Sequence, residues 1–376
     1  MNQPKDGRIR VLVVDDSAVV REVLARELIR DPAIVVVGTA ADAYIAREKI
    51  LKLEPDVITL DIEMPRMDGV TFLRKLMTHH PLRVIVLSSL AEPGAQAALD
   101  ALALGAIDVL PKPRGDARNG RVECIDELIE HIKVAATAKL PERSQPARRR
   151  SARHSAVPTP GGKSDRAAGA TGGPVIGIGA STGGTEAMRR VLMGLPADSP
   201  GVLAAIHMPE GFTRRYAERL NDACAMEVHE AVDGEVLRAG CVLLARGGRH
   251  LVLTQVGSRH IVNLRDGPPV NRHRPSIDVL FHSLVEVNGA AACGVLLTGM
   301  GADGADGLLA MRRAGAETIV QDEASCVVFG MPKVAIERNA AGRIASIDAI
   351  APAIRDWSRQ RLRRPSPFQA PVEPHS

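Results

Sequence analysis

The chain lacks the features of an exported, disulfide-bonded or membrane-spanning protein. Its five cysteines are scattered over 376 residues, with no C-x-x-C pair and no cysteine–histidine cluster at zinc-site spacing. The first residues, MNQPKDGRIR, contain no apolar core of a signal peptide, and no apolar run is long enough to cross a bilayer. We therefore expect a cytoplasmic protein with reduced thiols and no direct insertion into a membrane.

Most of the chain has no excess of positive charge, because the basic residues that set the net charge are concentrated in one segment. The formal net charge is +4, whereas residues 141–170 alone carry seven basic residues against two acidic ones. This segment is rich in Pro, Gly, Ser and Ala and nearly free of large apolar residues, so it cannot form a packed core. We expect a flexible basic linker over residues 135–172. Because no recognition-helix pattern follows it, we expect no nucleic-acid partner.

Two domains are expected, since 376 residues exceed the size of one ordinary domain. Short apolar segments alternate with amphipathic ones on both sides of the linker. This pattern predicts an α/β protein with two doubly wound parallel sheets, a flavodoxin-like one over residues 8–134 and a Rossmann-like one over residues 173–357. Residues 358–376 have the composition of the linker and are expected to form a disordered tail.

Polar residues follow four of the strands predicted in the first domain. They are Asp15 and Asp16, then Asp61, then Ser88 with Ser89, then Lys112. The carboxyl ends of parallel strands meet at the edge where such sheets bind ligands. Converging carboxylates suit Mg²⁺ together with a phosphate, with which a lysine would pair. Each feature alone is explained as well by helix capping or a solvated loop, but the four together favour a functional site.

This combination resembles the receiver domain of bacterial two-component response regulators. The matching stretches are DDS at 15–17, LDIEMPRMDG at 60–69, the VLSS strand end and PKP at 111–113. The resemblance implies that Asp61 is the phosphoacceptor, that Ser88 or its neighbour Ser89 is the switch hydroxyl, and that Lys112 contacts the phosphoryl group. It also implies a cis bond between Lys112 and Pro113. The Mg²⁺ ligands that it implies are Asp15, Asp16, Asp61 and the carbonyl of Glu63.

The stretch VIGIGASTGG, residues 175–184, allows two interpretations. A dinucleotide site would need an acidic residue at the end of the second strand to bind the ribose, but that strand, VLAAI, is followed by His207. Gly179, Ser181 and Gly183 instead fit the G-x-S-x-G turn that exposes a nucleophilic serine between a strand and a helix. Ser181 could also serve only to cap the helix.

A nucleophilic serine needs a base, and the base needs an acid that orients it. His207 and Asp303 both follow apolar strands, so both can reach the sheet edge that carries Ser181. Spacing alone leaves other candidates open. They are Asp306 for the acid and His250, His273 and His282 for the base.

Five stretches of the second domain resemble the catalytic domain of the chemotaxis response regulator protein-glutamate methylesterases. They are GASTGG (179–184), HMPEGFTRRYAERL (207–220), GPPVNRHRPSIDVLF (267–281), LLTGMGADGADGL (296–308) and QDEASCVVFGMP (321–332). The resemblance implies a nucleophile at Ser181, a base at His207 and an orienting acid at Asp303. For the oxyanion we expect the backbone N–H groups of Thr182 and Met300.

The resemblance also implies what the protein does and with which partners. A phosphorylation-activated hydrolase would release methanol from glutamate γ-methyl esters of chemoreceptors during adaptation, and family members also deamidate receptor glutamines. The phosphodonor would be a chemotaxis histidine kinase, Mg²⁺ would assist phosphorylation, and the ester reaction would need no cofactor. The alternatives are a phospho-dependent binding module without catalysis and a nucleotide-dependent oxidoreductase, which the missing ribose acid argues against.

Overall fold

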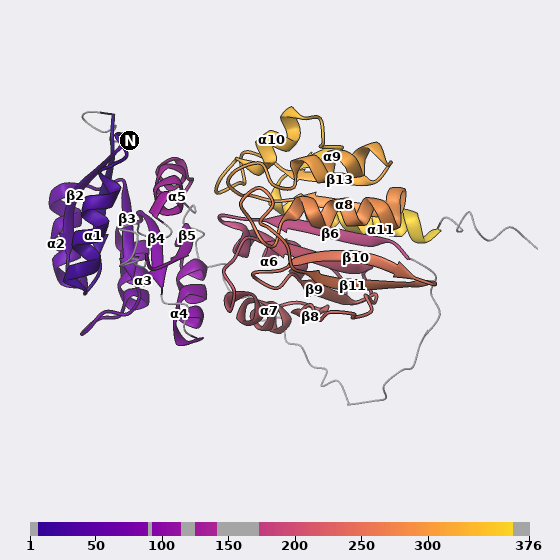
Figure 1. The fold of residues 1–376 in the computed structure, drawn as a ribbon, viewed down its shortest axis with the longest axis horizontal. Helices are drawn as coiled ribbons and strands as arrows, with labels where there is room; N and C mark the ends of the chain where they lie inside the picture. The colour runs from indigo at the N-terminus through magenta and orange to yellow at the C-terminus, as the bar shows by residue number, and fades with distance from the viewer. Residues whose placement is uncertain (1–6, 89–91, 114–124, 141–172, 364–376) are drawn as a thin grey trace, which may run out of the picture.

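The computed structural model describes residues 7–88, 92–113, 125–140 and 173–363, which form two parallel β-sheets with helices on both faces and one antiparallel hairpin (Figure 1). The predicted α/β fold with two doubly wound sheets is confirmed. Ser89 lies outside the described residues, as do residues 141–172 of the expected linker and 364–376 of the expected tail. Within the described ranges, no helix has the length and apolar character needed to cross a bilayer.

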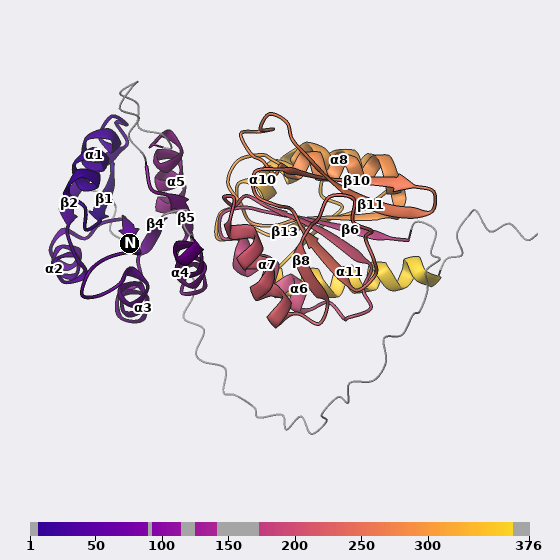
Figure 2. The ribbon, with the colours of Figure 1, turned by 60° about the horizontal axis from the view of Figure 1, so that its bottom comes forward.

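The first sheet has five parallel strands in the flavodoxin-like order β2-β1-β3-β4-β5. Ser17, Asp42 and Asp68 fix the starts of α1, α2 and α3, because their side chains accept hydrogen bonds from backbone N–H groups of the first turn. Helices α1 and α5 pack on one face and α2, α3 and α4 on the other (Figure 2). The elements are β1 (Ile9–Val14), α1 (Ala18–Leu28), β2 (Ile34–Ala40), α2 (Ala43–Leu53), β3 (Val57–Asp61), α3 (Gly69–His79), β4 (Arg83–Ser88), α4 (Glu92–Ala103), β5 (Asp108–Pro111) and α5 (Ile125–Thr137).

The second sheet has seven parallel strands in the order β14-β13-β12-β6-β7-β9-β8. Its first members along the chain are β6 (Val175–Ala180), α6 (Gly184–Met193), β7 (Gly201–Ile206), α7 (Phe212–Ala223), β8 (Glu227–Glu230) and β9 (Cys241–Leu244). They are followed by α8 (Ile277–Asn288), the short 3₁₀ helix η1 (Gly289–Ala291), β12 (Ala292–Leu296), α9 (Ala305–Arg313), β13 (Glu317–Gln321), α10 (Met331–Glu337), β14 (Arg343–Ala345) and α11 (Ile347–Arg363).

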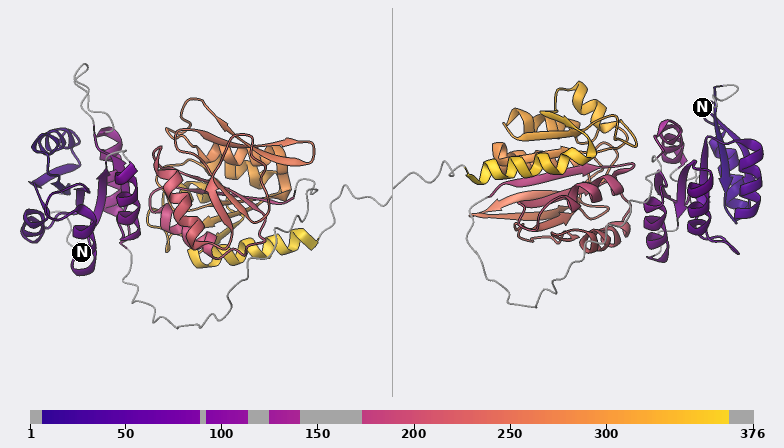
Figure 3. Two further views of the ribbon diagram at one scale, coloured as in Figure 1. Left: turned by 90° about the horizontal axis from the view of Figure 1, so that it is seen from below. Right: turned by 180° about the vertical axis from the view of Figure 1, so that it is seen from behind.

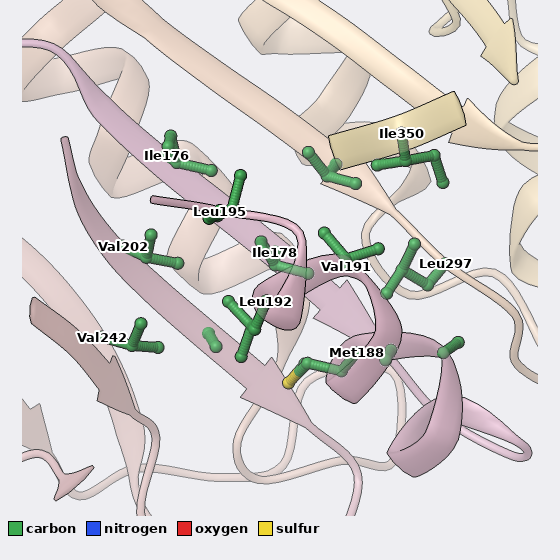
Figure 4. Close-up of a cluster of buried hydrophobic side chains, with 14 of the residues drawn as sticks. Ile176, Ile178, Met188, Val191, Leu192, Leu195, Val202, Val242, Leu297 and Ile350 are labelled. Carbon is green, nitrogen blue, oxygen red and sulfur yellow. The ribbon is translucent and has the colours of Figure 1, made fainter. Parts of the chain in front are cut away.

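Two apolar layers hold the second sheet between its helices. Every residue of β6 and β7 is buried, as expected for central strands of a parallel sheet. On one face Ile176 and Ile178 pack against Met188 and Val191 of α6 (Figure 4), with α7 and α11 completing that layer. Helices α8, α9 and α10 cover the other face (Figure 3). These two layers fix the position of the turn that follows β6 relative to the sheet.

Three local features differ from expectation. Strands β10 (His250–Val256) and β11 (Arg259–Arg265) form a separate antiparallel hairpin rather than joining the parallel sheet. Helix α11 continues past Trp357 to Arg363, where an Arg361 side chain donates to the Ala290 carbonyl, so the helix ends later than the expected boundary at 357. Among the described residues the cis peptide bond is Arg274–Pro275, so the cis bond expected at Lys112–Pro113 is wrong.

Gly179 provides a test of the packing between β6 and α8. A Cβ atom at this position would lie 2.3 Å from Cγ2 of Ile277, which is fully buried at the start of α8. We expect Gly179→Ala to lower the free energy of unfolding by about 1–3 kcal/mol, as overpacked cores do. Urea unfolding followed by the fluorescence of Trp357, the single tryptophan, measures it.

Gly173→Ala is the matched control, because nothing lies within 4 Å of its added Cβ. Equal stability of the two variants would show that α8 does not pack this closely on β6.

Candidate active site

Ser181, His207 and Asp303 meet because three neighbouring strands end side by side. Strand β6 is central, with β7 on one side and β12 on the other. Ser181 directly follows β6, His207 directly follows β7, and Asp303 lies in the turn between β12 and α9. The backbone N–H of His207 donates to the carbonyl of Ala180, at 3.2 Å, which fixes the start of the His207 loop against the end of β6.

The three side chains form a hydrogen-bonded chain. Nδ1 of His207 lies 3.1 Å from Oγ of Ser181, and Nε2 of His207 lies 2.8 Å from Oδ2 of Asp303. The His207 side chain is 6% exposed and that of Asp303 is 1% exposed. An ionised Asp303 can only accept, so Nε2 carries a proton and Nδ1 is left as the acceptor for the serine hydroxyl. The ring is thereby held in the tautomer that a base needs.

Asp303 stays ionised although it is buried. Burial alone would raise its pKa, but hydrogen bonds from His207, Asn271 and the backbone N–H of Ile277 hold the pKa below the usual range of a carboxyl group. Oδ1 accepts from Ser276 Oγ at 2.7 Å and from Asn271 Nδ2 at 2.9 Å. Oδ2 accepts from the Ile277 N–H at 2.6 Å. These donors lie at and just before the N-terminus of α8, where a helix favours negative charge.

The turn after β6 has the geometry of a serine elbow. Gly183 has a φ of 74°, which disfavours other residues, and a Cβ there would lie 2.5 Å from Cβ of Val327. The backbone N–H groups of Thr182 and Met300 donate to no acceptor among the described residues. The Thr298 side chain donates to the Thr182 carbonyl at 3.1 Å and so ties the elbow to the end of β12.

The other candidates lie elsewhere. Asp306 pairs with Arg338 on the outer side of α9. His250 supports the turn before α8, because its Nδ1 accepts from the Ser276 N–H at 3.2 Å. His282 is exposed on α8. His273 does lie at the site, but its ring stacks on that of His207.

The polar residues at the edge of the first sheet also come together. Ligand atoms of Asp15, Asp16 and Asp61 lie within 4.8 Å of one another. Burial raises the pKa of Asp61 to about 6 and also raises that of Asp15. Nζ of Lys112 lies 2.7 Å from Oδ2 of Asp61. The buried Oδ2 of Asp15 lies 3.6 Å from the same Nζ, beyond hydrogen-bond distance, which leaves this carboxylate oxygen able to ligate a divalent cation.

Two further residues belong to this edge. Ser88 is buried at the end of β4, and its hydroxyl donates to the Gly94 carbonyl at 3.2 Å. Glu63 follows Asp61 by two residues, and its backbone N–H donates to Oδ1 of Asp61 at 2.9 Å. The Glu63 backbone is thereby held beside Asp61, and Ser88 ends the strand next to the one that carries Asp61.

Comparison with known proteins identifies the family. A family model described as CheB methylesterase matches residues 176–354, and one described as response regulator receiver domain matches residues 11–119. The chain is 50% identical over 359 residues to a protein-glutamate methylesterase/protein-glutamine glutaminase of Syntrophotalea carbinolica, covering 94% of this chain and 99% of the relative. The chain belongs to the CheB methylesterase family.

A second curated relative supports the assignment. Protein-glutamate methylesterase/protein-glutamine glutaminase 4 of Anaeromyxobacter dehalogenans is 52% identical over 352 residues, which cover 92% of this chain and 94% of the relative. Among solved structures, the CheB methylesterase catalytic domain of Thermotoga maritima is similar at 33% identity with a TM-score of 0.49, covering 49% of this chain and 98% of that one.

In this CheB-family chain the receiver lies against the serine elbow. Helix α4, strand β5 and helix α5 face the methylesterase domain (Figures 1 and 3). The Thr182 hydroxyl donates to Oδ2 of Asp108 in β5 at 2.6 Å. Leu102, Asp108 and Val109 of the receiver help line the cavity beside Ser181 and His207. That cavity measures about 20 Å³, close to the space of a single water molecule.

Contacts away from the elbow extend this interface. Asp100 of α4 pairs with Arg219 of α7 at 2.7 Å, with both side chains partly exposed. Leu99 packs into the apolar layer of the methylesterase domain, and Phe212 packs into that of the receiver. Beyond α5, the Lys139 side chain donates to the Glu323 carbonyl at 2.6 Å.

Sequence reasoning missed several residues of the site. Asn271, Ser276 and Ile277 hold Asp303, yet they entered only as part of the family stretch around NRHRPS. Asp108 and His131 belong to no sequence motif; His131 pairs with Asp108, and Asp108 accepts from Thr182 on the other domain. Their place on β5 and α5 becomes meaningful only when the two domains are seen together.

The pairing of His131 with Asp108 should make the free energy of unfolding depend on pH. Burial alone would lower the pKa of His131, but its 3.0 Å contact with Asp108 raises that pKa. A raised pKa stabilises the folded state fully below the ordinary histidine value of about 6.5, and this stabilisation is lost as the pH rises through the higher folded value. We expect Asp108→Asn to lower the pKa of His131, measured by NMR titration of the imidazole protons.

Glu48→Gln, which removes an exposed carboxylate from α2, is the control and should leave the titration of His131 unchanged. A His131 that titrates alike in wild type and Asp108→Asn would refute the ion pair.

Proposed function

We propose that this chain is a phosphorylation-activated hydrolase that removes methyl groups from glutamate γ-methyl esters of chemoreceptors. The observation that carries the proposal is the chain of hydrogen bonds from Ser181 through His207 to Asp303 at the carboxyl edge of the seven-stranded sheet. The names of the relatives agree with it, since they are protein-glutamate methylesterase/protein-glutamine glutaminases. The reaction would take place in the cytoplasm, on receptor segments that face it.

The geometry suits acyl transfer. Oγ of Ser181 attacks the ester carbonyl while Nδ1 of His207 takes the serine proton. The oxygen that becomes negative would be held by the N–H groups of Thr182 and Met300. The imidazolium of His207, oriented by Asp303, returns the proton to the departing methanol. Water then enters, gives a proton to His207 and attacks the acyl carbon; the bond to Oγ breaks, and His207 returns the proton to Ser181 as the glutamate carboxyl leaves. The same steps on a receptor glutamine would release ammonia.

Phosphorylation would act through the receiver. Asp61 would accept a phosphoryl group from a chemotaxis histidine kinase, with Lys112 and Ser88 as its contacts. Asp15, Asp16, Asp61 and the Glu63 carbonyl would hold Mg²⁺, which supplies positive charge to the transferred phosphoryl group. We propose a receiver domain and a methylesterase domain close to the expected ranges 8–134 and 173–357. Helices α5 and α11 run past these bounds to Thr137 and Arg363, so the linker expected over 135–172 and the tail expected over 358–376 would begin after those helices.

The unphosphorylated receiver would inhibit the enzyme by covering Ser181. The small cavity beside His207 and the contact between Asp108 and Thr182 support this role. Phosphorylation of Asp61 would draw Ser88 and Lys112 towards the phosphoryl group and so weaken the docking of α4, β5 and α5. Typical coupling energies of about 1–3 kcal/mol correspond to roughly 5- to 150-fold activation.

The role of Asp303 is tested by removing its charge. Asp303→Asn leaves the size of the side chain unchanged but favours the wrong tautomer of His207, so we expect the rate of methanol release to fall by about 10⁴-fold. The assay uses methyl-labelled receptor membranes with a phosphodonor, and Ser181→Ala defines the rate without a nucleophile.

Asp306→Asn is the matched control, because Asp306 pairs with Arg338 on the outer side of α9 and should leave the rate within about threefold of wild type. A larger loss in Asp306→Asn than in Asp303→Asn would show that Asp303 is not the acid that orients His207. Full activity of Ser181→Ala would refute the serine mechanism. If the wild-type protein released no methanol, the second domain would be a docking module without catalysis.

The inhibitory role of the receiver is tested at the pair between Asp100 and Arg219. Arg219→Ala removes an ion pair that joins the domains without touching the elbow. Because partly exposed pairs contribute about 0.2–1 kcal/mol, we expect the rate without phosphodonor to rise by roughly 1.5- to 5-fold.

The rise should persist in Asp61→Ala, where a phosphodonor no longer has an effect, and the charge swap Asp100→Arg with Arg219→Asp should reverse it. If neither the single variant nor the isolated fragment from Gly173 onward is faster than the unphosphorylated protein, the receiver does not inhibit by docking.

A further inference from the structure

A tight turn beside the candidate triad has an unusual backbone. In the segment Val270–His273 the backbone N–H of each end residue donates to the carbonyl of the other, at 2.9 and 3.0 Å. The two central residues, Asn271 and Arg272, have φ values of 51° and 70°. Positive φ at both central positions defines a type I′ turn, and for arginine this conformation is unfavourable. Such backbone conformations concentrate where a function requires them.

Two side chains of the turn contact the hydrogen-bonded pair of His207 and Asp303. Nδ2 of Asn271 donates to Oδ1 of Asp303 at 2.9 Å and to Oδ2 of Asp278 at 2.7 Å. The ring of His273 stacks on the ring of His207, with centroids 3.6 Å apart and planes 12° from parallel. One end of the turn therefore orients the acid, and the other covers a face of the base.

His273 contacts the triad through its ring face alone. Its ring nitrogens form no hydrogen bond with any group in the described ranges, in contrast to both nitrogens of His207. Burial and the neighbouring His207 lower the pKa of His273 to about 4, so His273 is neutral at neutral pH. The other charged groups that face it are Asp303, His131 of the receiver and Arg272. A neutral stacked ring adds no repulsion when His207 becomes positively charged.

We propose that His273 is a positioning residue, whose stacked ring holds the imidazole of His207 in the plane that joins Ser181 to Asp303. This inference rests on the proposed function. Rotation of a histidine ring about its Cβ–Cγ bond meets a broad and shallow torsional preference. The hydrogen bond to Asp303 fixes Nε2 but leaves the ring free to swing about that contact. Stacking against His273 removes this remaining freedom, so that Nδ1 faces Oγ of Ser181.

The test compares His273→Ala with His273→Phe in the full-length protein, assayed for methanol release with a saturating phosphodonor. His273→Ala should lower kcat by on the order of 10- to 100-fold, the effect of a misplaced catalytic group, with KM nearly unchanged. His273→Phe keeps a flat ring without a titrating nitrogen and should recover activity to within about threefold of wild type. His282→Ala, which removes an exposed histidine from α8, is the control for losing an imidazole.

A second readout does not depend on activity. A stacked ring shields the imidazole protons of His207, so their NMR signals should move downfield in His273→Ala and stay near their wild-type positions in His273→Phe. Wild-type kcat in His273→Ala, a His273→Phe enzyme as slow as His273→Ala, or unmoved His207 signals would each overturn the positioning role. If wild type itself releases no more methanol than Ser181→Ala, the proposed function fails as well, and that outcome is distinct from the other three.

Discussion

A single buried charge organises the second domain. The carboxylate of Asp303 is 1% exposed, and an isolated ion at such a depth would be strongly unfavourable. It is accommodated because the N-terminus of α8 supplies the Ile277 N–H, the Asp278 N–H and the capping Ser276 hydroxyl. Helix α8 in turn packs on β6 through Gly177 and Gly179, whose missing side chains allow the close approach. The nucleophile strand, the helix and the acid therefore form one rigid unit.

The parts of the fold that could be predicted are those that burial dictates. Strands such as β6 and β7 are buried along their whole length, so they appear in the sequence as apolar runs, and the polar residue after each run lies at the sheet edge. His207 and Asp303 were predicted in this way, and Ser181 from the glycine turn that follows β6. The antiparallel arrangement of β10 and β11 was missed, although Gly257 and Ser258 between the two strands are a recognised two-residue hairpin signal.

The residues that support the site were harder to predict for a physical reason. Asn271 and His273 act from a turn whose backbone has positive φ, and a turn carries no periodicity from which the direction of a side chain follows. The contacts between Asp108 and Thr182 and between Asp100 and Arg219 depend on how two separately folded surfaces fit together. Neither surface contains a sequence pattern from which its contact partner could be predicted.

The hydrogen bond from Thr182 to Asp108 has an electrostatic consequence for the docked enzyme. It holds a carboxylate one residue away from the nucleophile, beside the N–H group that would receive the negative oxygen of the tetrahedral intermediate. When His131 is neutral, a second negative charge so near raises the energy of that intermediate, whereas a protonated His131, 3.0 Å from the same carboxylate oxygen, offsets it. The docked receiver would therefore oppose the reaction most strongly above the pKa of His131, even for an ester small enough to reach Ser181. Its departure would remove an unfavourable field as well as a physical barrier.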